Sequence, residues 1–121
     1  MSNKEKELSL IPKAQNYIEY VIEMIIKLPR TEKFNIGEMY KQSTYTMLGD
    51  ILHITKIEKD KIMIVLNNID CELNTQRCFL RIMYKYRWID QKKFNVAMEK
   101  IGEMGRILGG LIKYYGKNNK E

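Results

Sequence analysis

The residues best suited to catalysis lie on one stretch with helical spacing. His53 follows Asp50 by three residues, which lets a carboxylate orient an imidazole as a general base. Ser43 lies ten residues before His53, about 15 Å along a helix axis, so these residues cannot form a local triad. Asp70 and Glu72 point to different sides of a helix, which favours solvated carboxylates over an acid–base or metal pair. We therefore expect no catalytic residues and no enzymatic activity.

Cysteine, histidine and glycine patterns argue against a metal or cofactor. The chain has one histidine and two cysteines, with no CxxC or HxxxH motif. Cys71 and Cys78 would lie about 10 Å apart along a helix, too far for a disulfide, so we expect reduced, buried thiols. The glycines between positions 102 and 110 lack the lysine and hydroxyl residue of a phosphate-binding loop. We expect no metal and no cofactor.

Apolar residues recur at three- and four-residue spacing through nearly the whole chain, which predicts four helices. We expect them from about Pro12 to Leu28, from the cap Asn35 to about Ile57, from the cap Asp60 with apolar positions Ile62 to Met83, and from the cap Asp90 through Tyr115. Asn35 and Glu38 match a capping box, with Phe34 and Met39 as its hydrophobic staple.

The short connections between these helices predict an all-α fold, an antiparallel four-helix bundle. The 121 residues allow one domain, 1–121, with 1–11 as an N-terminal extension and 117–121 as a flexible tail. The charged run Lys4 to Glu7 is incompatible with a signal peptide, and the apolar stretch 17–28 is charged and too short to span a bilayer. We expect a cytoplasmic protein with no membrane partner.

Positive charge is concentrated in the C-terminal half. The formal net charge is +6, and residues 77–117 alone hold ten lysines and arginines against Asp90, Glu99 and Glu103. Such asymmetry is typical of a protein with a polyanionic partner. A lysine-rich solvated surface is the other interpretation, and charge alone does not separate the two.

The basic residues also follow helical spacing. Arg77, Arg81 and Lys85 step by four beside the apolar face of the third predicted helix, and a second stripe lies opposite the apolar face of the fourth. Aromatic residues 79, 86 and 88 are interleaved with the first stripe, which suits base stacking or a protein interface. The predicted nucleic-acid or partner contacts are Arg77, Arg81, Lys85, Arg87, Lys92, Arg106 and Lys113.

Three glycines share one side of the fourth predicted helix. Gly102, Gly105 and Gly109 fall within about 60° on a helical wheel, and each costs roughly 1 kcal/mol of helix stability relative to alanine. Close approach of another helix, inside the bundle or from a second subunit, would offset this cost. The predicted oligomer interface is therefore Gly102, Gly105 and Gly109. Alternatively, Gly109 and Gly110 merely fray the helix end.

Three runs carry a family resemblance. The segments 28–37, 73–82 and 103–113, the last reading Glu-Met-Gly-Arg-Ile-Leu-Gly-Gly-Leu-Ile-Lys, resemble Avd, the accessory variability protein family of diversity-generating retroelements. The resemblance covers roughly residues 13–115. A sister family, encoded in intervening sequences of ribosomal RNA genes, shares the bundle but usually carries a Pro-x-Asn-Ile-Ala-Glu-Gly-like element where this chain has residues 44–50.

The resemblance implies a barrel-like homopentamer without catalytic activity that binds the retroelement's reverse transcriptase and RNA, with DNA as a further partner. The complex would copy a template RNA into cDNA with errors at adenines. Arg77, Arg81 and Arg106 match basic positions of the family motifs, whereas Leu111 stands where tryptophan is frequent. The sister family leaves an alternative: a protein-assembly module without nucleic-acid function.

Overall fold

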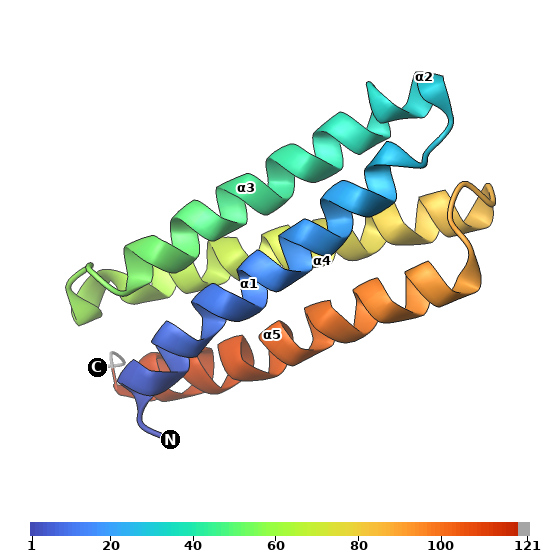
Figure 1. Cartoon of the computed structure of the whole chain (residues 1–121). Helices are drawn as coiled ribbons and strands as arrows, with labels where there is room; N and C mark the ends of the chain where they lie inside the picture. Colours follow the sequence, from blue (N-terminus) through green and yellow to red (C-terminus); the bar gives the residue numbers. More distant parts are fainter. Residues whose placement is uncertain (119–121) are drawn as a thin grey trace.

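The computed structural model describes residues 1–118 and contains only helices among them. Four long helices, α1 (Asn3–Ile26), α3 (Ile36–Ile54), α4 (Ile62–Lys85) and α5 (Gln91–Asn118), are joined by short connections. The connections contain the one-turn helix α2 (Arg30–Lys33) and the 3-10 turn η1 (Lys59–Lys61). Consecutive long helices run in opposite directions, and α1 and α4 each pack mainly against α3 and α5 (Figure 1). The predicted all-α, four-helix architecture is confirmed.

The first helix begins nine residues earlier than the sequence predicts. Ser2 and Glu5 form a capping box, in which Ser2 Oγ accepts from the Glu5 amide (3.1 Å) and Glu5 Oε1 from the Ser2 amide (3.3 Å). Pro12 therefore lies inside α1, on its exposed side, and not in its first turn. Residues 3–11 are part of the bundle and bury Glu7 and Leu10, so the expected N-terminal extension is wrong.

The predicted capping box at Asn35 and the predicted cap Asp60 are wrong. Asn35 occupies the N-cap position of α3, as predicted, but its side chain makes no cap hydrogen bond and instead donates to the carbonyl of Thr31 (3.0 Å), while Phe34 and Met39 are both exposed. The α3 helix ends at Ile54, three residues early. Asp60 lies in η1, and Lys61 precedes α4 without a side-chain cap. Hydrophobic periodicity does not predict α2, because its four residues bury no side chain.

The last predicted cap is confirmed. Asp90 Oδ1 accepts a 2.8 Å hydrogen bond from the Lys93 amide, and this bond is the main reason that the pKa of Asp90 lies below its ordinary value. The α5 helix then runs through Asn118, so only residues 119–121 of the expected tail lie outside the described residues. The predicted apolar positions of α4 and α5 are buried, except that Phe94 is half-buried.

Two polar clusters interrupt the apolar core. The Tyr17 hydroxyl donates to Gln76 Oε1 (2.7 Å), so its 2.9 Å bond with Tyr40 must be donated by Tyr40. Gln76 Nε2 donates to Ser43 Oγ (3.1 Å), which completes a network across α1, α3 and α4. The second cluster surrounds the fully buried Glu7.

No helix within residues 1–118 is apolar and long enough to cross a membrane.

Candidate nucleic-acid interface

The residues considered for catalysis are not assembled into a site. His53 is exposed on α3, and no hydrogen bond to Asp50 is described within residues 1–118. Asp70 is exposed, as expected, but Glu72 is half-buried and lies against Asp50 across the α3–α4 contact. Burial and this neighbouring carboxyl raise the pKa of Glu72 to about 8. The prediction that Glu72 is a solvated carboxylate is therefore wrong.

Both thiols are free, and both are exposed on α4, so the prediction of buried cysteines is wrong. Cys71 and Cys78 lie on the outer side of α4, away from its buried apolar residues. No group of three or more His, Cys, Asp or Glu residues that could hold a metal is present among residues 1–118.

The first basic stripe lies along α4. Arg81 and Lys85 are exposed, whereas Arg77 is half-buried and its guanidinium donates to Asn74 Oδ1 (2.7 Å). Arg81 Nη1 lies 4.0 Å from Cys78 Sγ, the only hydrogen-bond partner described for its guanidinium within residues 1–118. The stripe therefore begins with a positioned guanidinium and ends with a solvated ammonium group.

The second stripe lies on the outer side of α5. Lys92, Arg106 and Lys113 are all exposed there, as predicted. Lys113 also lines a hollow of about 410 Å³ with Gly110, Tyr114 and Lys117. The two stripes lie on helices that pack against each other, and Arg77 of the first stripe reaches Gly105 on α5. We call these residues together the α4–α5 basic surface: Arg77, Arg81, Lys85, Arg87, Lys92, Arg106 and Lys113.

Two of the three α5 glycines predicted at an interface lie beneath cations of this surface. A Cβ atom added at Gly105 would lie 3.1 Å from Arg77 Nη2, and one at Gly102 would lie 3.6 Å from Arg106 Nη1. A Cβ at Gly109 would meet nothing within 4 Å. No neighbouring backbone of the same protomer therefore requires glycine at these three positions, so the expected close helix approach inside the bundle is wrong. Two guanidinium groups from different helices are instead brought onto adjacent turns of α5.

The alternative of a frayed helix end is also wrong, because α5 continues for eight residues beyond Gly110. One further cation near α5 is absent from the predicted contact residues. Lys6 Nζ lies 3.7 Å from the position of an added Cβ at Gly110. Lys6 was overlooked because residues 1–11 were expected outside the bundle, although the Ser2 and Glu5 spacing is a capping-box signal.

The remaining basic residues of the surface lie where α4 turns into α5. Lys85 and Arg87 line a hollow of about 800 Å³ together with Trp88 and Lys93. Lys93 was absent from the predicted contacts, although its position beside Lys92 put it within the same basic segment. This hollow therefore adds aromatic surface to the end of the α4 stripe.

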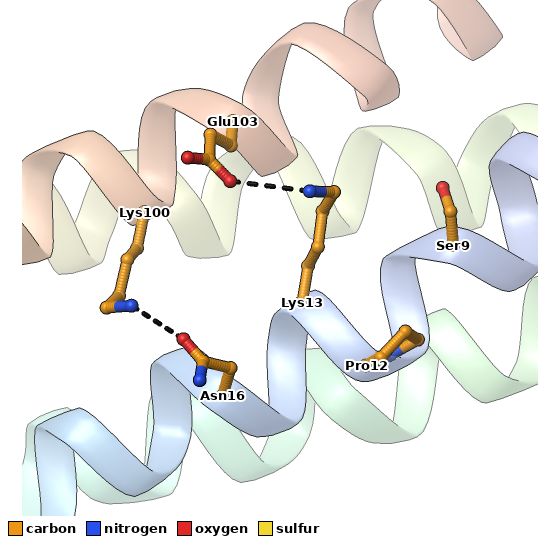
Figure 2. A pocket seen from close by; sticks show the side chains of 6 residues that line it. All are labelled: Ser9, Pro12, Lys13, Asn16, Lys100 and Glu103. Atoms are coloured by element: carbon orange, nitrogen blue, oxygen red, sulfur yellow. Dashed lines mark hydrogen bonds and ion pairs between the residues drawn. The ribbon is translucent and has the colours of Figure 1, made fainter.

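A separate pocket of about 380 Å³ lies between α1 and α5 (Figure 2). Lys13 pairs with Glu103 across it (3.4 Å), and Lys100 donates to Asn16 Oδ1 (2.6 Å). The Ser9 hydroxyl at its edge already donates to the Lys6 carbonyl (2.7 Å). Its polar groups are thus paired with one another, and it offers no activated nucleophile.

Comparisons with known proteins identify the family. No curated protein and no solved structure gives a significant match to this chain. A family model described as bAvd-like matches residues 8–115, which begins five residues before the segment in which the sequence motifs were recognised. The match includes α3, α4 and nearly all of α5, and therefore every residue of the α4–α5 basic surface. The chain belongs to the bAvd-like family of Avd-type accessory proteins.

Proposed function

We propose that this protein is a non-catalytic accessory protein of a diversity-generating retroelement, which binds the reverse transcriptase and nucleic acid through the α4–α5 basic surface. The observation that carries the proposal is the placement of Arg77 and Arg106 over the glycines of α5. Guanidinium groups bind phosphate oxygens in bidentate geometry. Two guanidinium groups that are already held in place therefore suit contact with the phosphates of a nucleic-acid backbone. Self-assembly into a ring, proposed here as a pentamer, would repeat this surface and multiply weak contacts.

A salt titration of RNA and DNA binding tests the nucleic-acid part of the proposal. If Arg81 and Lys85 each contact a phosphate, replacing both by glutamine should flatten the slope of log K against log salt by about 1.4 for single strands. The loss should be similar for unrelated sequences, because phosphate contacts do not read bases. The matched control replaces Arg30 and Lys56, both exposed and outside α4 and α5, by glutamine. Equal slopes for the two double variants would contradict the proposed surface.

Direct binding to the reverse transcriptase needs a separate measurement, because arginines can also dock an acidic protein surface. A pull-down after nuclease treatment retains a direct protein contact and loses an RNA-bridged one. A wild-type protein that captures the enzyme but binds no nucleic acid at low salt would support the assembly-module alternative instead.

A further inference from the structure

The turn between α4 and α5 contains a strained residue. The amide of Trp88 donates to the Met83 carbonyl (2.9 Å) and that of Arg87 to the Tyr84 carbonyl (3.0 Å), which is the Schellman pattern that ends many helices. In this pattern Arg87 holds the left-handed position, with φ of 61°. Glycine is usual there, and another residue costs about 1 kcal/mol or more. Arginine at this position therefore makes the turn less stable than glycine would.

Two aromatic pairs flank the strained residue. The rings of Tyr86 and Trp88 stack with centroids 5.3 Å apart and planes 24° apart, and those of Tyr84 and Phe94 stack at 4.6 Å and 20°. The second pair joins α4 to α5. Tyr86 is nevertheless 60% exposed, so a ring already supported on one face by Trp88 presents its other face to solvent.

Lys85 and Arg87 flank Tyr86 in the chain, and its stacking partner Trp88 lines the hollow at the turn. Lys85, Arg87 and Lys93 line the hollow at the turn, against Asp90 as its one acidic residue. The Asp90 carboxylate is already engaged: one oxygen accepts from the Lys93 amide and the other lies 3.7 Å from Lys93 Nζ. No ion pair is described for Lys85 or Arg87 among residues 1–118. The hollow is therefore net positive, and Lys85 continues the α4 stripe into it.

We propose that the α4–α5 turn binds single-stranded nucleic acid by stacking an unpaired base on Tyr86, with Lys85 and Arg87 contacting the adjacent phosphates. This inference rests on the proposed function and adds the state of the strand to it. Cations alone do not distinguish a single strand from a duplex, because both carry phosphates. An unpaired base can unstack from the adjacent bases and stack on an aromatic side chain, whereas a base inside a duplex cannot. The strain at Arg87 is consistent with a charge kept for binding at the expense of the turn.

The test compares a short single-stranded RNA with the blunt duplex of the same sequence. Tyr86→Ala should weaken binding of the single strand roughly 5- to 150-fold, the range found for loss of one stacked base. Binding of the duplex should change less than about twofold. Tyr86→Phe keeps the ring and should restore single-strand binding. Arg87→Gly should weaken binding of both ligands while leaving the protein at least as stable as wild type.

Trp88 supplies a direct signal, because it is the single tryptophan of the chain. Stacking of a base beside the Tyr86–Trp88 pair should change its fluorescence with the single strand and not with the duplex, and Tyr86→Ala should abolish that change. Circular dichroism of each variant establishes that the helices are intact.

Each outcome separates this inference from the proposed function. Equal weakening of single-strand and duplex binding by Tyr86→Ala, or no weakening, would overturn base stacking and leave the basic surface in place. Loss of a nuclease-resistant reverse-transcriptase contact in Tyr86→Ala, with unchanged RNA binding, would assign the ring to a protein interface. Failure of the wild-type protein to bind either nucleic acid would overturn both proposals.

Discussion

The Tyr115 hydroxyl donates a 2.7 Å hydrogen bond to the carboxylate of Glu7, which lies 108 residues earlier in the chain. The other Glu7 oxygen accepts from Lys59 Nζ at 2.9 Å, and Lys59 also donates to the Ile54 carbonyl (2.7 Å). One fully buried carboxylate therefore ties the first turns of α1 to the last turns of α5 and to the α3–α4 connection.

Tyr115→Phe should lower the free energy of unfolding by about 1.5–3 kcal/mol, because it removes a hydrogen bond to a charged, buried acceptor and keeps the ring. Tyr45→Phe is the control, since Tyr45 is an exposed residue of α3. Urea denaturation followed by circular dichroism measures both. Equal midpoints for the two variants would mean that the Glu7–Tyr115 bond contributes nothing to stability.

The raised pKa of Glu72 predicts a pH dependence. The folded state holds a proton on Glu72 up to about pH 8, whereas the unfolded chain releases it near its ordinary pKa of 4.5. The unfolded state binds fewer protons in this window, so the contribution of Glu72 to stability falls as pH rises from about 4.5 to about 8.

Glu72→Gln should remove this dependence and raise the melting temperature at pH 8 by at least about 2 °C, while the two proteins converge near pH 4.5. Asp70→Asn changes an exposed carboxylate of the same helix and should leave the profile unchanged. Differential scanning calorimetry across this range gives both profiles. A gap between wild type and Glu72→Gln that does not widen with pH would contradict the assignment.

Gly109 provides a test of self-assembly that spares the protomer. An added Cβ meets nothing within 4 Å, so Gly109→Ala should raise helix stability by up to about 1 kcal/mol. If Gly109 contacts a second subunit, the larger Gly109→Gln should reduce the oligomer to smaller species in native mass spectrometry.

Gly49→Gln is the matched control, because Gly49 is exposed on α3 and its added Cβ is equally free. The same assembly in both variants would exclude Gly109 from the interface. A wild-type protein that is monomeric at micromolar concentration would contradict the proposed pentamer.

Helix number, core positions and the Asp90 cap were predictable because they depend on local periodicity and local hydrogen bonds. Pro12 misled because a proline suits a first turn, yet the earlier Ser2–Glu5 capping box set the start of α1. The Arg77–Gly105 and Asp50–Glu72 contacts join different helices, so spacing within one helix could not reveal them. The sequence shows Tyr86 and Trp88 only as aromatic residues among cations and does not predict that their rings stack. The left-handed backbone of Arg87 that lies between them could not be predicted either, because glycine, the usual signal for that conformation, is absent there.

The hydrogen bonds among Tyr17, Tyr40 and Gln76 fix the axial register of the bundle. Sliding one helix past another by a turn, about 5.4 Å, would leave these groups unpaired in a dry core at a cost of about 1–3 kcal/mol each. A purely apolar core would resist such a displacement far less, because successive layers of apolar side chains can replace one another without leaving a polar group unpaired. Gln76 directly precedes Arg77 in the chain. The hydrogen bonds of Gln76 therefore also set the position along the helix axis at which the Arg77 guanidinium reaches Gly105. The position of the Arg77 guanidinium on the outside of the protein thus depends on neutral hydroxyl and amide groups at its centre.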